Sequence, residues 1–384
     1  MAASDWSRRR FLTAAWLGCS AAAHPLVTPA VFASAPWDAR LVVLILRGGL
    51  DGLDVLRPSG DRDFVAARPT LGKPGVDLDG RFTLHPAMSA LHPLWTAGEF
   101  GAVHAVSTPY RDKRSHFEGQ DLLEAGTGMD VEPGARRGGW LNRMLQSVPG
   151  VSARTAFAIG QANPLILSGP APVSNWSPET KFAVSAQAAL LLETIYHDTP
   201  LFRDALTEAL TLAEEAGSTT SDVSLAQYAA DQLRGETRIA TFSLGGWDTH
   251  RGQAGWHMNK RLEQLGETIL ALREGLGPIW ERTTVIAMTE FGRSLRENDA
   301  QGTDHGTGGA LLLAGGAIRG GRVHGRWPGL AAQDLYAGRD LMPTGDVRGS
   351  AAWVMRGLFG LDRSVLERDI FPGLDMGDDP NLLL

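Results

Sequence analysis

An aliphatic run from Arg40 to Leu46, closed by Arg47-Gly48-Gly49, is the feature that most constrains the fold of this chain. Such a run is typical of a strand that is buried on both faces of a parallel sheet. Further strands are predicted at 100–106, 238–244, 283–288 and 310–314, and helices at 88–97, 179–215, 222–234 and 256–276. Because strands alternate with helices, we expect an α/β fold with a mostly parallel central sheet and helices on both faces.

Residues 1–35 are typical of a twin-arginine export signal. The segment Ser7-Arg8-Arg9-Arg10-Phe11-Leu12 precedes a moderately apolar stretch, and small residues follow at 33–35. Cleavage after Ala33 competes with cleavage after Ala35, because Pro36 would follow the second site. No other segment approaches the roughly 20 apolar residues that span a bilayer. We therefore expect a periplasmic or secreted protein without a membrane span, in which residues 36–384 form one α/β domain.

Composition excludes several classes of function. The net charge of −7 makes the chain mildly acidic, which argues against a nucleic-acid partner. The single cysteine, Cys19, lies inside the predicted signal, so the exported chain would have neither a disulfide nor a cysteine metal site. A redox cofactor is also disfavoured, since cysteine ligands and a dinucleotide fingerprint are both missing from the sequence.

Candidate metal ligands gather in the last third of the chain. Asp248 and His250 lie in Gly-Gly-Trp-Asp-Thr-His, Glu290 lies in Thr-Glu-Phe-Gly-Arg, and Asp304 and His305 lie in Gly-Thr-Asp-His-Gly. Carboxylate and imidazole groups together suit a hard or borderline divalent cation. Most of these groups follow predicted strands, and the carboxyl ends of the strands form one edge of an open α/β sheet, where ligands bind. We expect them to converge at that edge.

Five sequence blocks carry a resemblance to a known family. They are Arg-Gly-Gly-Leu-Asp-Gly-Leu-Asp (47–54), Arg-Ser-His-Phe-Glu-Gly-Gln-Asp (114–121), and the blocks at 245–250, 289–293 and 302–306. They resemble the signature blocks of an exported bacterial family catalogued as domain of unknown function 1501. That family is grouped with the alkaline-phosphatase-like superfamily of phosphatases, sulfatases and phosphomutases, and it has no agreed reaction. The resemblance covers nearly the whole exported chain and implies an alkaline-phosphatase-like fold.

The resemblance also implies one or two divalent ions, Zn, Mn, Mg or Ca. One ion would be held by Asp248, His250 and His305. The other would be held by Asp51, Glu290 and Ser115. Asp304 would have a supporting role beside the first ion. The second site would lack its imidazole, because Phe291 stands where a histidine is expected, and this makes the site harder.

Such a site implies ester hydrolysis with Ser115 as the nucleophile. A neighbouring metal would lower the pKa of the Ser115 hydroxyl for attack on phosphorus or sulfur, and a covalent seryl ester would then be hydrolysed. Arg47 or Arg114, together with Arg293, could hold the equatorial oxygens through a bidentate fork. His116 could carry a proton or cap the loop. The expected substrate is a small-molecule or polymer ester of phosphate or sulfate.

Simpler interpretations stay open for each residue. Asp51 and Ser115 lie near glycine-rich turns, where such residues are usually turn formers or helix caps. Glu290 could form a loop salt bridge with Arg293. The whole chain could be a catalytically degenerate exported protein that keeps the fold and binds an envelope protein. Phe291 favours this alternative, whereas the retained serine, carboxylates and histidines favour hydrolysis.

Overall fold

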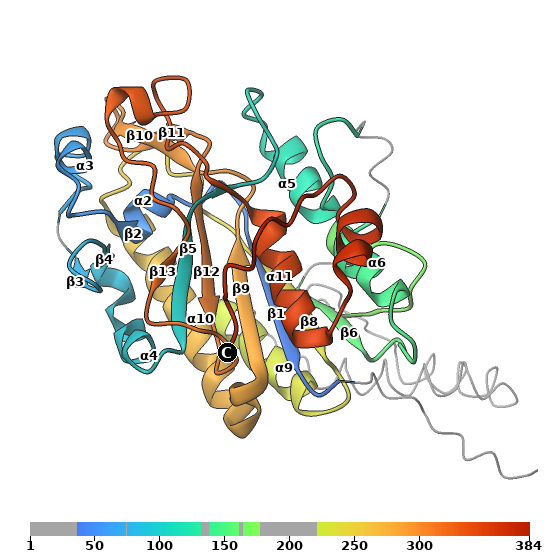
Figure 1. Ribbon diagram of the computed structural model, residues 1–384. Coiled ribbons are helices and arrows are strands. Elements are labelled where there is room, and N and C mark those ends of the chain that lie inside the picture. The colour runs from blue at the N-terminus through green and yellow to red at the C-terminus, as the bar shows by residue number, and fades with distance from the viewer. Residues whose placement is uncertain (1–36, 74, 132–137, 161–163, 177–220) are drawn as a thin grey trace, which may run out of the picture.

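A nine-stranded sheet forms the centre of the structure (Figure 1). The computed structural model describes residues 37–73, 75–131, 138–160, 164–176 and 221–384. The predicted signal at 1–35 and the predicted helical region at 179–215 lie outside the described residues. Within the described part of the chain, no helix has the length and apolarity that crossing a membrane requires.

The strands of this sheet run in the order β13-β5-β12-β9-β1-β8-β6-β7, and β14 pairs with β5. Their bounds are β1 Arg40–Leu46, β5 Phe100–Ser107, β6 Ala156–Ile159, β7 Ser174–Trp176, β8 Ile239–Leu244, β9 Thr283–Met288, β12 Gly309–Ala314, β13 Val323–His324 and β14 Gly345–Asp346. The five strands expected from the sequence are all present, at or within one residue of the expected bounds. The mostly parallel α/β fold is thereby confirmed.

One strand departs from the parallel arrangement. β1 pairs in parallel with both β8 and β9, but β12 is antiparallel to both β9 and β5. The carboxyl ends of β1, β5, β8 and β9 therefore lie at the same edge of the sheet as the beginning of β12. Residues that precede β12 consequently reach the same edge as residues that follow the other strands.

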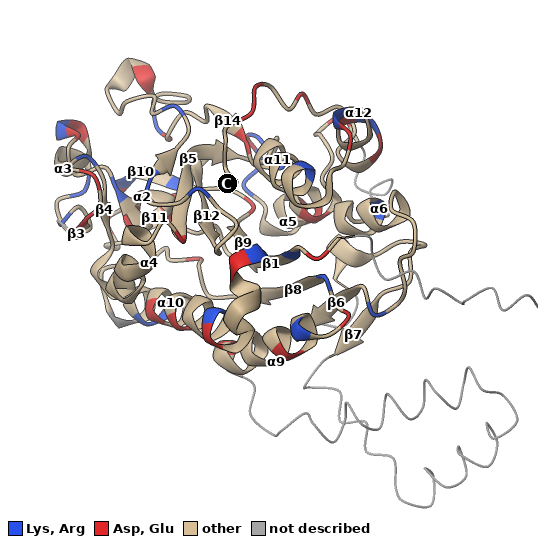
Figure 2. Cartoon of the chain, turned by 60° about the horizontal axis from the view of Figure 1, so that its bottom comes forward, with Lys and Arg blue, Asp and Glu red and all other residues tan. Residues whose placement is uncertain are grey.

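Helices cover both faces of the sheet (Figures 1 and 2). Residues Val42, Leu44 and Leu46 of β1 pack in a core with α9 (Asp222–Arg234) and α10 (Trp256–Leu276). The alternate residues of β1 pack in a second core with α6 (Trp140–Gln146) and α11 (Val347–Phe359). α5 (His116–Ala125) contributes Leu123 to that second core. This alternation explains the unbroken aliphatic run, since each face of β1 needs apolar side chains.

Short elements complete the described chain. They are α2 Gly52–Val55, β2 Leu56–Arg57, α3 Arg62–Ala67, β3 Val76–Asp77, β4 Thr83–Leu84, η1 Pro86–Leu91, α4 His92–Thr96, η3 Leu165–Leu167, η4 Gly277–Arg282, β10 Arg293–Glu297, β11 Thr303–His305, η5 Ala332–Asp334, α12 Arg363–Val365 and η6 Leu366–Ile370.

The helix expected at 88–97 is split into η1 and α4. The boundary lies between Leu91 and His92, and Pro93 in the first turn of α4 lacks the N–H that would continue one helix through this point.

Candidate metal centre

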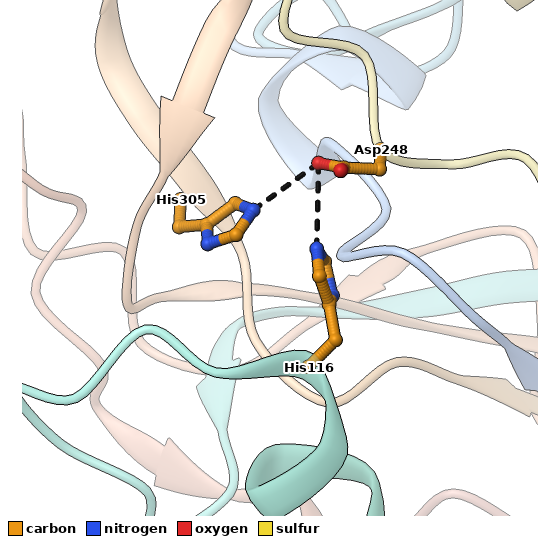
Figure 3. A group of neighbouring side chains, drawn as sticks. All are labelled: His116, Asp248 and His305. Atoms are coloured by element: carbon orange, nitrogen blue, oxygen red, sulfur yellow. Dashed lines mark hydrogen bonds and ion pairs between the residues drawn. The ribbon is translucent and has the colours of Figure 1, made fainter.

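Three imidazole rings converge on one carboxylate oxygen at the carboxyl edge of the sheet. The Oδ1 atom of Asp248 lies 3.0 Å from Nε2 of His250, 3.1 Å from Nε2 of His305 and 3.4 Å from Nε2 of His116. Figure 3 shows His116 and His305 directed at this carboxylate. Nε2 of His250 and Nε2 of His305 are themselves only 2.9 Å apart. The predicted residues Asp248, His250 and His305 are thus brought together, with His116 added.

The opposite nitrogen of each ring faces an acceptor. Nδ1 of His116 lies 2.8 Å from Oε1 of Glu290, and Nδ1 of His305 lies 3.0 Å from the carbonyl oxygen of Arg114. Nδ1 of His250 lies 3.5 Å from Oδ1 of Asp304. A ring that donates through Nδ1 leaves a lone pair on Nε2. The Nε2 atoms of all three rings would then present lone pairs to one another around the Asp248 carboxylate.

This donor set fits a divalent cation. His116, Asp248 and His305 offer ligand atoms that all lie within 4.8 Å of one another. Ligands at zinc–nitrogen distances of about 2.0–2.1 Å are roughly 3.4 Å apart in a tetrahedron, so a small adjustment would close the site. Nε2 of His116 is buried and has no hydrogen-bond partner among the described residues. An ion would satisfy this atom and relieve the repulsion between lone pairs.

Local structure explains how the loop with Asp248 is held. It follows β8, and the buried Trp247 indole donates to the carbonyl of Leu244 at 2.9 Å. Gly48 packs directly against the loop with φ of 121°, and a Cβ there would lie 2.6 Å from the backbone nitrogen of Asp248. Glycine is therefore needed at 48 for the two loops to pass each other.

Charges around Asp248 keep its carboxylate ionised. Burial raises its pKa, but the hydrogen bond and charge of Arg293, together with His250 and His305, outweigh burial and bring the pKa to about 2. The buried Arg293 Nη1 donates to Oδ1 of Asp248 at 2.8 Å. Burial lowers the pKa of His305, which favours the neutral ring that a metal requires. The loop salt bridge considered between Glu290 and Arg293 is replaced by this pairing of Arg293 with Asp248.

Glu290 supports His116 instead of facing the cluster as a ligand. The side chain is fully buried, and Oε1 accepts hydrogen bonds from Gly48 N at 2.9 Å and from Gln120 Nε2 at 3.0 Å. Oε2 accepts from the hydroxyl of Thr289 at 2.9 Å. Burial raises the Glu290 pKa, but the hydrogen bonds from His116, Gln120 and the backbone together lower it below its ordinary value. The hydrogen bond to Glu290 in turn raises the pKa of His116.

Asp51, which the sequence predicted as a metal ligand, forms a buried ion pair with Arg68 in the structure. Its carboxylate is fully buried and accepts two hydrogen bonds from the Arg68 guanidinium, at 2.8 Å and 3.1 Å. Gln253 Nε2 donates to it at 2.6 Å, and the backbone of Leu53 donates at 3.2 Å. Burial raises the Asp51 pKa, but the charge and hydrogen bonds of Arg68, the hydrogen bond from Gln253 and the charge of Arg293 together lower it below its ordinary value. The positive charge of the Arg68 guanidinium thus balances the Asp51 carboxylate, at the position where the sequence suggested a ligand of a second metal ion.

Two of the predicted catalytic residues have protein partners. The Arg47 guanidinium donates to Ser243 Oγ at 3.0 Å and Gln120 Oε1 at 2.8 Å, and it pairs with Glu124 at 2.5 Å. Ser115 is the N-cap of α5, and its hydroxyl oxygen accepts from the backbone of Glu118 at 3.5 Å. The Arg47 guanidinium is therefore engaged in hydrogen bonds within the protein. Ser115 caps α5 next to His116.

Arg114 and Asp304 lie at the border of the cluster. Arg114 is exposed, and its backbone has φ of 54°, a strained value for a non-glycine residue. Its carbonyl is the acceptor for His305. Asp304 accepts from Asn298 Nδ2 at 3.1 Å and lies 3.7 Å from Arg339. The Asn298 bond is the main cause of a lowered Asp304 pKa.

His116 was expected from the sequence to carry a proton or to cap the loop, and it was not among the predicted metal ligands. The only signal for it was its place next to Ser115, after β5 and at the start of a helix. Phe291 packs between rings, with centroids 5.0 Å from His116 and 4.9 Å from His305, and it forms an apolar wall of the site.

Comparison with known proteins places the chain in a family. A family model described as "Protein of unknown function (DUF1501)" matches residues 99–367, and the chain belongs to this family. No curated protein matches the sequence.

Several solved structures are similar to this chain at low identity. The C-terminal periplasmic domain of EcEptC from Escherichia coli, in complex with Zn, is 11% identical with a TM-score of 0.39, covering 73% of this chain and 74% of that one. A protein in the alkaline phosphatase superfamily from Vibrio parahaemolyticus is 13% identical with a TM-score of 0.40, covering 89% and 73%. The lipoteichoic acid synthase LtaP from Listeria monocytogenes is 10% identical with a TM-score of 0.37, covering 90% and 78%.

Proposed function

We propose that this protein is an exported metal-dependent hydrolase of phosphate or sulfate esters. It binds one divalent ion through Asp248, His116, His250 and His305. One observation carries the proposal: three Nε2 atoms meet at Oδ1 of Asp248, while the Nδ1 atom of each ring faces a protein acceptor. Acceptors behind metal-binding histidines fix the tautomer and orientation of the ring in metalloenzymes.

The ligand chemistry favours zinc among the candidate ions. Three imidazoles and one carboxylate are nitrogen-rich, and zinc accepts this set in four-coordinate geometry. Magnesium and calcium prefer oxygen ligands, and manganese prefers sites richer in carboxylate. The second ion expected from the sequence is left out, because Arg68 already balances Asp51.

The chain's own residues supply the remaining chemistry. A bound ion polarises an ester oxygen and stabilises developing negative charge. Ser115 lies at the amino end of α5, where the helix dipole favours an anion, and its hydroxyl attacks phosphorus or sulfur. The alcohol leaves with a proton, and water then hydrolyses the seryl ester to restore Ser115 and release phosphate or sulfate. The exposed Arg114 guanidinium binds equatorial oxygens of the transferred group.

A second candidate function is an exported binding protein without turnover. The pairing of Asp51 with Arg68 favours it, since that pairing removes a carboxylate that a two-metal hydrolase would use. The use of Ser115 as a helix cap points the same way. In this case the ion would stabilise the surface around α5 and the β10–β11 hairpin for an envelope protein partner.

Turnover by the zinc-loaded protein separates the two candidates. A panel of phosphate monoesters, phosphate diesters and sulfate esters is offered to the wild type and to Asp248→Ala. Hydrolysis of at least one ester class by the wild type, lost in the variant, is the expected result. If the wild type holds zinc but hydrolyses none of these esters, the hydrolase proposal is wrong and the binding-protein function takes its place.

A further inference from the structure

We propose that Gln253 is a positioning residue that sets the separation between the two segments carrying the metal ligands. One segment is the loop 245–255, with Asp248 and His250, and the other is β11, which ends at His305. The inference rests on the proposed metal site and adds to it the element that holds the site's geometry. Gln253 lies outside the ligand set, and its side chain is 1% exposed.

The amide oxygen of Gln253 joins the two ligand segments. Oε1 accepts a hydrogen bond from the Thr249 hydroxyl at 2.9 Å and another from the Thr303 hydroxyl at 2.7 Å. Thr249 stands between the ligands Asp248 and His250 in the chain. Thr303 begins β11, two residues before His305, and its backbone nitrogen donates to the carbonyl of Thr249 at 3.2 Å. One oxygen atom therefore ties both segments together.

The amide nitrogen of Gln253 ties the same junction to the end of β1. Nε2 donates to Oδ2 of Asp51 at 2.6 Å and to Oδ2 of Asp54 at 2.9 Å. Asp51 is held in turn by Arg68, and Asp54 by Arg57 at 2.7 Å. Both carboxylates are buried within α2 and its N-cap. The ligand segments are thus anchored to a rigid part of the fold.

The surrounding charges leave Gln253 only one orientation. A flipped amide would place its oxygen against the carboxylates of Asp51 and Asp54, which accept only, so both of these hydrogen bonds would be replaced by repulsion. A buried amide with all four bonds made and one allowed orientation is a fixed spacer. Because Nε2 of His250 and Nε2 of His305 are only 2.9 Å apart, a small relative shift of the two segments changes the ligand geometry.

The test replaces Gln253 with methionine, which has a similar shape but makes no such hydrogen bonds. Replacement of a residue that supports metal ligands typically lowers metal affinity by about 10–100-fold. We therefore expect Gln253→Met to weaken zinc binding by a factor in that range. A shifted visible absorption spectrum of the Co²⁺-loaded variant is expected as well, since that spectrum reports ligand geometry. Zinc affinity and the Co²⁺ spectrum are both measured alongside the urea unfolding midpoint.

Asn142→Leu is the matched control for lost stability. Asn142 on α6 is also fully buried and also makes four amide hydrogen bonds, to Leu167, to Ala171 twice and to Gln146. None of these partners belongs to the ligand segments. The control should lower the unfolding midpoint while leaving zinc affinity and the Co²⁺ spectrum at wild-type values.

A milder variant decides the matter if Gln253→Met does not fold. Thr249→Val removes only one donor to Oε1 and keeps the side-chain shape, and zinc affinity is expected to fall by about 3–10-fold. Wild-type zinc affinity and spectrum in the folded variants would overturn the positioning role alone. A wild type that binds no zinc would overturn the proposed function, and the positioning role with it.

Discussion

Oε1 of Glu290 lies 2.8 Å from Nδ1 of His116, so the buried carboxylate after β9 orients the imidazole at the start of α5. The glutamate that the sequence predicted as a metal ligand is thereby paired with the imidazole that we propose as an additional ligand. Glu290 keeps this position through hydrogen bonds from Gly48, Gln120 and Thr289.

Glu290→Gln should weaken zinc binding by about 10–100-fold while the protein stays folded. The amide keeps the size of the side chain but removes the negative charge that makes His116 a better ligand. Isothermal titration with zinc measures the change, and Glu281→Gln at an exposed position is the control. Equal affinity in the wild type and Glu290→Gln would show that the pairing with His116 does not support metal binding.

The buried pair of Asp51 and Arg68 should contribute to folding as an ion pair, with no direct contact of either side chain to the metal. Both side chains are 0% exposed, so Arg68→Met leaves a buried carboxylate without its partner. Breaking a buried ion pair typically costs about 3–5 kcal/mol, and this loss is expected in urea unfolding. The double variant Asp51→Leu/Arg68→Met should recover most of the loss. A single variant as stable as the wild type would contradict this role.

Ser115→Asn separates the two roles of the serine. Asparagine is as good an N-cap as serine, so α5 and the unfolding midpoint should be preserved. Ester hydrolysis should fall by at least about 1,000-fold, because the amide cannot replace the nucleophilic hydroxyl. Ser221→Asn changes the corresponding cap of α9, where Ser221 accepts from Ser224 N at 3.1 Å, and should leave hydrolysis intact. Undiminished turnover in Ser115→Asn would exclude a seryl ester.

Stability should fall in mild acid because two buried histidines are held neutral. Burial lowers the pKa of His104 and the pKa of His85 from 6.5 to about 4 in each case. In His104, Nδ1 accepts the Ala105 N–H at 2.8 Å, and a proton on that atom would break the bond.

The folded-state pKa of each ring lies below its unfolded value, so the unfolded chain binds more protons between pH 6.5 and about 4. The stabilisation is complete above pH 6.5 and is lost as the pH falls toward 4. The loss is on the order of 3 kcal/mol per histidine. Urea unfolding at several pH values measures it, and His104→Gln should flatten the dependence. The same pH dependence in that variant would rule out His104 as a source.

Much of the fold could be predicted from the sequence because apolar patterning reports burial directly. The aliphatic run of β1 and the 3.6-residue pattern of α10 each have one physical interpretation. The direction of β12 could not be predicted, since Gly309–Ala314 is a short apolar segment with no feature that distinguishes a parallel from an antiparallel strand. That direction is what brings His305 to the same edge as Asp248.

The candidate site was predicted less completely, because partners distant in sequence decide what a carboxylate does. Asp51 follows a strand just as a metal ligand would. The residues around Asp51 give no indication that the guanidinium of Arg68 forms an ion pair with its carboxylate. His116 was expected only to carry a proton or to cap the loop, because it follows Ser115, which matched the expected nucleophile. The spacing of Asp248 and His250 did indicate a shared site, since both lie in one glycine-flanked loop.

Zinc content of His116→Ala tests the central claim most directly, because His116 distinguishes the four-ligand site from the set suggested by the sequence. We expect about one zinc per wild-type chain after reconstitution and dialysis, and little zinc in His116→Ala or Asp248→Ala. His92→Ala on α4, which precedes the opposite end of β5, should retain wild-type zinc. Negligible zinc in the wild type, or undiminished zinc in His116→Ala, would contradict the account.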